Sequence, residues 1–425
     1  MIEERLGVHY RGAAVAELCR EEGGDLALRY DPEVVGRLGG GVLISASLPV
    51  RGEPYRTAEL LPFFDGLLPE GQARRQLARR LRLDETDVFG FLREIGRDCA
   101  GAISLLPEGE EPDDVGRPGV EWLDGDDLEQ EVADLVSRPL GVEPARGVRI
   151  SLAGAQSKLA VVVSPEGRIG LPRGTTASTH ILKPGSVERW GLGPAYPGLV
   201  ANEAFCLRLG RRLGLEAPPA RLIRIGGEPV LLIERYDRVH GSDGVERLHQ
   251  EDFCQALGVP SYRKYEADGG PGLLELVETI RRLSIRVTRD LDMLVDRVVL
   301  DHLVGNADAH AKNFALLYTP EGPVLAPAYD IISTAVYPHL ARPSAMAIGG
   351  SYEPEDLSPE GWREGLAALG LSPRRYRGRI AELVRHVLVA AGEVRDRLDE
   401  EGAGGHPVDA IEDLIRRRAA LLAVA

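Results

Sequence analysis

The stretch Asn306-Ala-Asp308-Ala-His310-Ala-Lys312-Asn313 places five polar side chains within eight positions. It follows an apolar run, Leu300-Asp-His-Leu-Val304, whose spacing predicts the end of a helix. Asparagine and lysine are rare elsewhere, because the 425 residues include three asparagines and four lysines. Coding bias explains the rarity of these residues but not their concentration in a few segments. We therefore interpret the stretch as part of an active site.

The spacing within this stretch is typical of a phosphotransferase catalytic loop. Protein kinases use an aspartate of that loop to accept the proton of the substrate hydroxyl, and an asparagine five residues later to bind metal. Asp308 and Asn313 have this spacing. Lys312 could hold the transferred phosphoryl group as a point charge, and Asn306 and His310 could support the loop by hydrogen bonds. A polar turn with capping residues is the alternative interpretation.

A kinase also needs a second carboxylate downstream of the catalytic loop. Asp330 lies 17 residues beyond Asn313, in Pro327-Ala-Tyr-Asp-Ile-Ile332. Magnesium that bridges nucleotide phosphates takes one or two carboxylates together with phosphate oxygens. We therefore predict Asn313 and Asp330 as Mg²⁺ ligands and the adjacent Tyr329 as a nucleotide contact. An aspartate at this place could also be a simple turn residue.

One of the four lysines ends an apolar, strand-like run, His180-Ile-Leu-Lys183-Pro. Kinases keep a lysine on such a strand to contact the α- and β-phosphates of ATP, and pair it with a glutamate of the following helix. We predict Lys183 as the phosphate contact and Glu203, in Ala201-Asn-Glu-Ala-Phe-Cys206, as its partner. A surface glutamate on that helix explains Glu203 equally well.

A small, polar segment between two predicted strands, Ile150-Ser-Leu-Ala-Gly-Ala-Gln-Ser-Lys-Leu159, has the character of a loop that approaches phosphate. It matches neither a Walker motif nor the glycine loop of protein kinases. The predicted phosphate contacts are the loop backbone and one lysine side chain: Ser151, Ala153, Gly154, Ala155, Gln156 and Lys158. Considered alone, the segment is better explained as an ordinary hairpin loop.

The run Leu231-Leu-Ile-Glu-Arg-Tyr-Asp-Arg238 begins as a buried strand and then becomes charged, as a hinge between two lobes would. We expect the backbone around Glu234 and Tyr236 to contact the adenine. A strand that runs into a charged turn is the alternative. Farther along, Leu248-His-Gln-Glu-Asp-Phe253 is predicted to begin a helix, where Gln250 could contact the nucleotide or could cap the helix.

The rest of the chain predicts an α+β fold of several parts. Apolar runs such as Leu26 to Tyr30 and Gly41 to Ser45 predict a small antiparallel sheet, and periodic stretches predict helices over Leu61 to Leu83 and Val88 to Ile95. Strands around one helix follow, and helices predominate after about residue 250. We expect a two-lobed enzyme with a cleft between its lobes, divided into domains 1–107, 108–236 and 237–425.

Composition excludes several classes of protein. A formal net charge of −15 disfavours broad, non-specific binding of nucleic acid, whose affinity depends on neutralising phosphates. The cysteines show neither disulfide nor zinc-site spacing, so we expect four reduced thiols: Cys19, Cys99, Cys206 and Cys254. No apolar stretch approaches the roughly 20 residues that cross a bilayer, and no secretion signal is recognisable. We expect a soluble, cytoplasmic protein.

Several of these segments together resemble the HipA family of serine/threonine kinases, along nearly the whole chain. Phe64-Asp-Gly-Leu-Leu-Pro-Glu-Gly71 and Ile95-Gly-Arg-Asp-Cys-Ala-Gly-Ala102 resemble the N-terminal subdomain that is particular to this family. The similar kinase motifs follow in order: Ser151 to Leu159, Thr179 to Pro184, Asn202-Glu203, Arg247 to Ala256, Asn306 to Asn313 and Pro327 to Asp330. The resemblance implies a protein-kinase-like fold with a β-rich N-terminal lobe, an added N-terminal subdomain and an all-helical C-terminal lobe.

The resemblance also implies the roles of individual residues. Asp308 would be the catalytic base, Asn313 and Asp330 would bind Mg²⁺, and Lys183 would contact ATP. Ser151 would be the autophosphorylation site, and its phosphate would be repelled from a loop that is built to hold the phosphates of ATP.

The phosphate loop departs from the family pattern at one place. It reads Ala155-Gln-Ser157-Lys158, where the family more often has Glu or Pro at the third position. Ser157 is therefore a second candidate phosphosite.

The usual partner in this family is a HipB-like helix-turn-helix antitoxin, which binds operator DNA and inhibits the kinase, and the usual substrates are aminoacyl-tRNA synthetases. By resemblance we expect the toxin of a type II toxin–antitoxin system that contacts DNA mainly through its antitoxin. Two alternatives stay open: a small-molecule phosphotransferase and a catalytically silent corepressor. The serine in the phosphate loop argues against the first, and the retained Lys183, Asp308, Asn313 and Asp330 argue against the second.

Overall fold

The computed structural model describes residues 2–110, 119–135, 140–141, 157–174, 176–185, 196–241 and 244–423. The chain forms two compact units, and neither is continuous in sequence. Unit 1 consists of Met1–Pro184, Ile225–Glu228 and Glu234–Tyr262, and unit 2 of Gly185–Arg224, Pro229–Ile233 and Arg263–Ala425. The predicted domain boundaries at 107 and 236 stay predictions.

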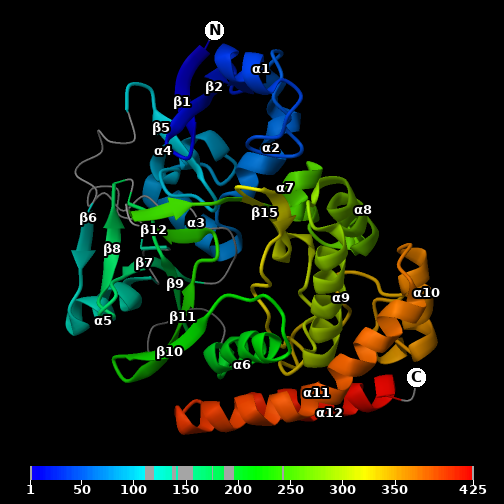
Figure 1. Ribbon diagram of the computed structural model, residues 1–425. Helices are drawn as coiled ribbons and strands as arrows, with labels where there is room; N and C mark the ends of the chain where they lie inside the picture. The colour runs from blue at the N-terminus through cyan, green and yellow to red at the C-terminus, as the bar shows by residue number, and fades with distance from the viewer. Residues whose placement is uncertain are drawn as a thin grey trace. The chain divides into compact units, whose positions relative to one another are not determined.

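Unit 1 begins with a five-stranded antiparallel sheet in the order β4-β3-β2-β1-β5. Three of these strands, β1, β2 and β5, are labelled in Figure 1. Its strands are β1 (Ile2–Tyr10), β2 (Ala13–Glu21), β3 (Leu26–Tyr30), β4 (Tyr55–Arg56) and β5 (Ile103–Pro107). Leu18 and Leu28 lie opposite each other and are fully buried, as expected for one face of a pleated sheet. The strand predicted over Gly41 to Ser45 is wrong. That segment is an irregular turn whose apolar side chain, Ile44, is buried without a partner strand.

The helices of unit 1 are α1 (Pro32–Leu38), α2 (Thr57–Gly66), α3 (Gly71–Leu81), α4 (Val88–Ile95), α5 (Gly125–Asp134) and α7 (Phe253–Leu257). The prediction of α4 is confirmed, and the Asp87 side chain caps it by accepting the Gly90 N–H at 2.8 Å. The single helix predicted over Leu61 to Leu83 is wrong, because the chain leaves the helix between α2 and α3. Pro69 lies in that break and has no N–H to donate to a helical ladder.

A second sheet in unit 1 places β9, β7, β8 and β6 side by side in that order. The strands are β6 (Gly119–Trp122), β7 (Leu159–Val163), β8 (Ile169–Arg173) and β9 (His180–Pro184). All three pairings are antiparallel, with Leu159 opposite Leu182. The unit is completed by the hairpin β12 (Arg238–Gly241) and β13 (Gly244–Arg247), by β14 (His249–Asp252), and by the 3-10 helix η3 (Ser261–Arg263) at its end.

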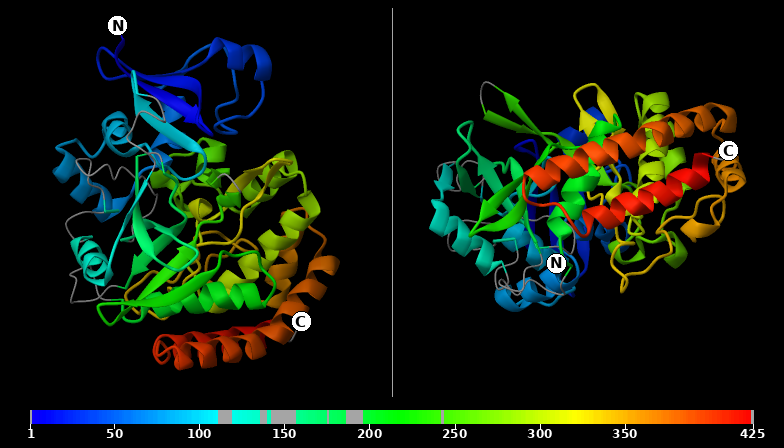
Figure 2. Two further views of the ribbon diagram at one scale, coloured as in Figure 1. Left: turned by 60° about the vertical axis from the view of Figure 1, so that its left-hand side comes forward. Right: turned by 90° about the horizontal axis from the view of Figure 1, so that it is seen from below.

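Unit 2 is mainly helical, as the sequence predicts after about residue 250. Its helices are α6 (Leu199–Arg212), α8 (Leu273–Leu283), α9 (Val287–Val304), α10 (Pro359–Ala368), α11 (Pro373–Glu400) and α12 (Val408–Ala423). Helices α11 and α12 run side by side, and α11 also packs on α6 (Figure 2). The unit is not purely helical. It includes β10 (Ala220–Ile225), the middle of β11 (Glu228–Glu234), the hairpin β15 (Ala315–Thr319) and β16 (Gly322–Leu325), and the 3-10 helices η4 (Glu266–Asp268), η5 (Ala311–Asn313) and η6 (Pro354–Asp356).

The end of α9 positions the polar stretch that follows it. Gly305 caps the helix with φ +76°, and the Asn306 N–H closes the turn by donating to the Asp301 carbonyl at 2.8 Å. A Cβ at Gly305 would lie 2.5 Å from a Leu414 methyl carbon and 2.7 Å from the Ala335 Cβ. The chain can therefore turn out of α9 at this place only with glycine.

All four cysteines are buried free thiols, which confirms the prediction that they form no disulfide. Burial raises the pKa of the Cys99 thiol to about 12, so this group stays protonated. None of the helices in the described part of the chain combines the length and the apolar character that crossing a bilayer requires.

Candidate active site

Asn306 holds the beginning of the polar stretch in unit 2. Its amide nitrogen donates to Asp301 Oδ1 at 2.9 Å, and its amide oxygen accepts the Asp308 N–H at 3.1 Å. Both Asn306 and Asp301 are about 95 % buried, so these bonds are protected from water. The result is a fixed path from the last turn of α9 to Asp308.

Asp308 and Asn313 are brought together by the turn between them. Asn313 Nδ2 donates to the Asp308 carbonyl at 2.8 Å, and the Asn313 N–H donates to the His310 carbonyl at the same distance. The carboxylate of Asp308 accepts a hydrogen bond of 2.6 Å from the hydroxyl of Tyr265. The two residues that the spacing singled out therefore lie in one compact loop.

The other predicted residues of this loop are buried around it. The His310 N–H donates to the Asp308 carbonyl at 2.9 Å, and its ring meets the Tyr265 ring edge-on at 5.2 Å. Lys312 is buried, and its carbonyl accepts a hydrogen bond of 2.7 Å from the hydroxyl of Tyr329. Tyr329 directly precedes Asp330, so this hydrogen bond connects the catalytic loop to the segment that contains Asp330.

Asp330 itself has φ +54°, the left-handed region that residues with a side chain rarely adopt. Strain of this kind persists where the surrounding structure enforces it, often at functional sites. No strand precedes Asp330 directly, because β16 ends at Leu325. The segment that leads to Asp330 is therefore irregular and lies outside any sheet.

Arg297 is a residue of this site that the sequence did not reveal. From α9 its Nε donates to Asp301 Oδ2 at 2.7 Å, and its Nη1 donates to the Tyr329 carbonyl at 3.0 Å. Its side chain is 3 % exposed. Burial raises the pKa of Asp301, although the charge of Arg297 acts in the opposite direction. An arginine four residues before an aspartate is common on exposed helix surfaces, so this spacing alone does not indicate that Arg297 belongs to an active site.

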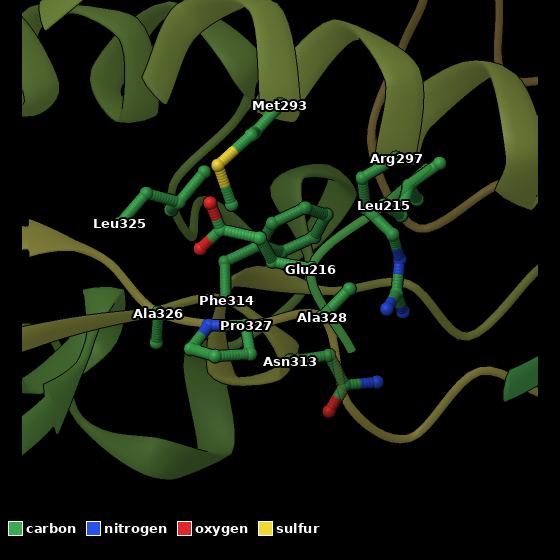
Figure 3. A pocket seen from close by; sticks show the side chains of 10 residues that line it. All are labelled: Leu215, Glu216, Met293, Arg297, Asn313, Phe314, Leu325, Ala326, Pro327 and Ala328. Carbon is green, nitrogen blue, oxygen red and sulfur yellow. The ribbon is translucent and has the colours of Figure 1, made fainter. Parts of the chain in front are cut away.

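A pocket adjoins the loop from within unit 2 (Figure 3). It encloses about 340 Å³, including space that is open to solvent. Its lining is mostly apolar and comes from several segments: Leu215, Glu216, Met293, Arg297, Asn313, Phe314, Leu325, Ala326, Pro327 and Ala328. The side chains of Asn313 and Arg297 lie at one side of it. This pocket borders the candidate metal ligand Asn313 rather than the carboxylate of Asp308.

Asn202 and Glu203 are buried in α6 of the same unit. The Asn202 amide nitrogen donates to the Ser333 carbonyl, and its oxygen accepts the Ser333 N–H, both at 2.8 Å. This paired contact holds the chain three residues after Asp330. The predicted pairing of Glu203, in unit 2, with Lys183, in unit 1, stays a prediction.

The predicted nucleotide contacts of unit 1 lie on its strands. Lys183 is the fourth residue of β9, and Lys158 directly precedes β7; both side chains are more than nine-tenths buried. Glu234 ends β11. Ser151, Ala153, Gly154, Ala155 and Gln156 lie outside the described residues. Ser157 is described and is half-buried.

Tyr236 and Gln250 contact each other within unit 1. The Tyr236 hydroxyl donates to Gln250 Oε1, and Gln250 lies on β14. The alternative that Gln250 caps a helix is therefore wrong. The cap of α7 is Asp252, whose side chain accepts the Gln255 N–H at 2.9 Å. In return, the Asp252 N–H donates to Oε1 of Gln255.

A group of five buried charges, here called the ion cluster, lies next to this pair: Asp98, Arg235, Asp237, Arg238 and Arg247. Asp237 Oδ2 accepts bonds of 2.8 Å from Arg235 and from Arg238. Asp98 Oδ1 forms ion pairs with Arg238 at 3.1 Å and with Arg247 at 3.0 Å. The side chains are between 1 % and 12 % exposed. Two carboxylates thus share three guanidinium groups away from water.

The charges of the ion cluster stabilise one another. Burial alone would raise the pKa of Asp237, but Arg235 and Arg238 together hold it well below its ordinary value. Burial lowers the pKa of Arg238 to about 10, so its guanidinium stays charged at neutral pH. Gln250 Nε2 reaches Asp237 Oδ2 at 3.5 Å. The cluster thereby extends to a predicted nucleotide contact.

The ion cluster gives a structural role to the stretch Ile95 to Ala102, which the sequence analysis singled out only by its resemblance to the HipA family. Asp98 belongs to the cluster, and the Gly101 N–H donates to Asp237 Oδ2 at 2.8 Å. Gly101 has φ +77°, and a Cβ there would lie 2.7 Å from the backbone nitrogen of Gln250. Polar residues that are scattered from 98 to 247 meet only in the folded chain, so their spacing could not reveal the cluster.

Comparisons with known proteins give a consistent result. Residues 150–391 match the family model of the HipA-like C-terminal domain, and residues 6–106 match that of the HipA N-terminal domain. The chain is 38 % identical over 426 residues to the Y4mE protein of Sinorhizobium fredii, covering 98 % of each. It is 30 % identical over 368 residues to the serine/threonine-protein kinase toxin HipA of Shewanella oneidensis, covering 83 % of this chain and 81 % of that one.

A solved structure shows the same fold. In the complex of HipA, HipB and operator DNA from Shewanella oneidensis MR-1, one chain matches with a TM-score of 0.80 and 24 % identity. The match covers 99 % of this chain and 96 % of that one. The α+β, protein-kinase-like fold expected from the sequence is thereby confirmed. Since a family model also covers more than half of its residues, the chain belongs to the HipA family of kinases.

Proposed function

We propose that the chain is an ATP- and Mg²⁺-dependent serine/threonine protein kinase and the toxin of a type II toxin–antitoxin pair. The observation that carries the proposal is the hydrogen bond from Asn313 Nδ2 to the Asp308 carbonyl at 2.8 Å. It joins a candidate metal ligand to a candidate base in one loop. In this proposal Asp308 accepts the proton of a serine or threonine hydroxyl, and Lys312 holds the transferred phosphoryl group.

The residues of unit 2 fit a magnesium ion. Because the amide nitrogen of Asn313 donates to a carbonyl, its amide oxygen is the atom left to bind a hard cation. Asp330 supplies a carboxylate. Among the described residues no group of three His, Cys, Asp or Glu side chains could hold a metal, which agrees with an ion that takes few protein ligands and keeps phosphate oxygens and water. When bound, the ion neutralises charge on the phosphates.

The residues of unit 1 are suited to bind the nucleotide. Lys183 and Lys158 provide buried ammonium groups for phosphate oxygens. Tyr236 and Gln250, held together by a hydrogen bond, provide a contact for the base or sugar. We propose Ser151 as the autophosphorylation site and Ser157, next to Lys158, as the second choice.

The test is incubation of dephosphorylated protein with Mg²⁺ and labelled ATP, followed by mass spectrometry of the peptides that contain Ser151 and Ser157. We expect label on the wild type, and labelling that is slower by about 10²- to 10⁴-fold in Asp308→Ala and in the isosteric Asp308→Asn. Both variants should still bind ATP, because Asp308 acts on the hydroxyl. Asp356→Asn, at an exposed position of unit 2, is the matched control and should be labelled normally.

Two other results would favour a function other than that of a protein kinase. Labelling of a small molecule from a cell extract, with no label on protein, would favour a small-molecule phosphotransferase. ATP binding without any transfer would favour a corepressor that acts with its antitoxin.

The proposed partners are a HipB-like helix-turn-helix antitoxin and, as substrate, an aminoacyl-tRNA synthetase or another protein of translation. Support comes from family membership and from the similar fold of the HipA chain in the HipA–HipB–DNA complex. The antitoxin would supply most contacts with DNA, because this chain carries a net charge of −15. Co-expression with the product of an adjacent helix-turn-helix reading frame should give a stable complex on size exclusion and should relieve growth arrest.

A further inference from the structure

Tyr265 contacts the proposed catalytic base directly. Its hydroxyl donates to Asp308 Oδ1 at 2.6 Å, a short distance for a bond between a hydroxyl and a carboxylate. Among the residues that the structure describes, this is the one hydrogen bond to the carboxylate of Asp308. No sequence motif indicates this contact, since Tyr265 lies 43 residues upstream of Asp308.

The backbone holds Tyr265 in place. Tyr265 precedes the 3-10 helix η4, and its carbonyl accepts the N–H groups of Asp268 at 3.1 Å and Gly270 at 2.9 Å. A Cβ at Gly270 would lie 1.9 Å from the Arg263 carbonyl oxygen, so this tight turn requires glycine. The turn therefore fixes the direction in which the tyrosine side chain leaves the backbone.

Neighbouring segments of unit 2 hold the same turn from outside. The Glu266 N–H donates to the Ala345 carbonyl at 3.2 Å, and the Glu266 carboxylate accepts the Ala347 N–H at 2.6 Å. The ring of Tyr265 packs edge-on against His310, and the Ala311 N–H donates to the Lys264 carbonyl at 3.4 Å. Tyr265 and the residue before it thus contact the catalytic loop at His310 and Ala311 as well as at Asp308.

A carboxylate that acts as a base must present one oxygen to the incoming hydroxyl. Without support the group rotates about its χ2 torsion, for which the preference is broad. A bond to Oδ1 from a rigidly held tyrosine restricts that rotation and leaves Oδ2 for the substrate. Misplacement by about 1 Å at such a site costs roughly a hundredfold in rate.

We propose that Tyr265 is a positioning residue for the phosphotransfer reaction, which orients the carboxylate of Asp308 through its hydroxyl. This inference rests on the proposed function and deepens it. The role belongs to the hydroxyl and not to the ring, so removing the oxygen alone should reveal it.

The test is Tyr265→Phe, which keeps the ring and its packing on His310. We expect kcat for autophosphorylation to fall about tenfold, a part of the roughly 10²- to 10⁴-fold that a positioned base contributes. KM and Kd for ATP should not change, and neither should the melting temperature. The matched control is Tyr262→Phe, three residues earlier, whose side chain is 78 % exposed and which should behave as wild type.

A double-mutant cycle separates positioning from a general structural role. On the Asp308→Ala background, Tyr265→Phe should cause no further loss of the residual rate, because its effect passes through the missing carboxylate. An additive loss would overturn the proposal, and so would a wild-type or increased kcat for the single variant. If the wild type itself shows no Asp308-dependent transfer, the proposed function fails and this inference fails with it. A wild-type rate in Tyr265→Phe alone rejects only the inference.

Discussion

Arg297 is the residue through which α9 contacts both polar segments of the candidate active site. One nitrogen of its guanidinium bonds to Asp301, which in turn holds Asn306, and another bonds to the carbonyl of Tyr329. The planar guanidinium carries donors in fixed directions, so it can hold a carboxylate and a carbonyl at once. A lysine has the same charge but cannot reproduce both contacts.

We therefore predict that Arg297→Lys weakens the apparent affinity of the protein for Mg²⁺. Residues that support metal ligands typically contribute about 10- to 100-fold to metal affinity or activity. The midpoint of a Mg²⁺ titration of autophosphorylation should rise by about tenfold at saturating ATP. Arg289→Lys is the control on the same helix, because its side chain is 64 % exposed. An unchanged midpoint in Arg297→Lys would show that Tyr329 and Asp330 keep their positions without it.

The residues of the site differ in how far the sequence reveals them. Asp308 and Asn313 lie within one loop, so their separation along the chain was enough to suggest the roles proposed for them. Tyr265 reaches the same loop from another segment, and Arg297 bonds to the carbonyl of Tyr329, through contacts that exist only after folding. Sequence spacing therefore identified the residues of the loop and not those that hold it.

At the scale of elements, the ion cluster connects the segment after α4 to the segment between β11 and β13. The contacts include main-chain groups, since the Arg238 guanidinium donates to the Gly101 carbonyl at 3.2 Å. Removing one partner from a buried ion pair leaves an uncompensated charge in a medium of low polarity. Such a change costs far more than the loss of an exposed pair.

We predict that Asp237→Asn lowers the free energy of unfolding by about 3–5 kcal/mol, since it leaves three guanidinium groups to share one carboxylate. The measurement is urea unfolding at pH 7.5, followed by circular dichroism. Glu17→Gln removes an exposed pair with Arg5 and should cost less than about 1 kcal/mol. Equal effects of the two changes would mean that water reaches the ion cluster.

Elements with a regular pattern of apolar residues were predicted well, and their boundaries less well. The positions of α4 and β3 agree with the sequence prediction because local periodicity and burial point to the same structure. The run Gly41 to Ser45 has strand-like composition but lies in a turn. Its Ile44 is buried by tertiary packing, and the Ile44 carbonyl lies 2.9 Å from the Nε2 atom of His249. Composition alone does not distinguish an apolar residue that is buried in a strand of a sheet from one, such as Ile44, that is buried in a turn.

At the scale of the whole molecule, each unit contains a buried histidine that resists protonation. Burial lowers the pKa of His249 in unit 1 to about 4 and that of His302 in unit 2 to about 3. In the unfolded chain histidine titrates near 6.5, so below that pH the unfolded state takes up the proton first. The stability that these groups contribute is complete above pH 6.5 and is lost as the pH falls toward the folded pKa.

We predict that the free energy of unfolding decreases by about 2 kcal/mol per buried histidine between pH 7 and pH 5. Urea unfolding at both pH values should give a smaller decrease for His302→Gln than for the wild type. His386→Gln, at an exposed position of α11, should leave the decrease unchanged. If His302→Gln and the wild type lose stability in parallel, then His302 is protonated in the folded protein or stays neutral in both states.

The discontinuous course of unit 1 has a consequence for the growing chain on the ribosome. Asp98 leaves the ribosome long before its partner Arg247, since 149 residues separate them. At a synthesis rate of about 5–20 residues per second, this interval lasts roughly 7 to 30 s. For most of it the carboxylate of Asp98 has to remain in water, because the first guanidinium group that makes its burial favourable, that of Arg235, is synthesised only near the end of the interval. Unit 1 can therefore complete its interior only after the first half of the polypeptide has been translated, whatever its N-terminal sheet does earlier.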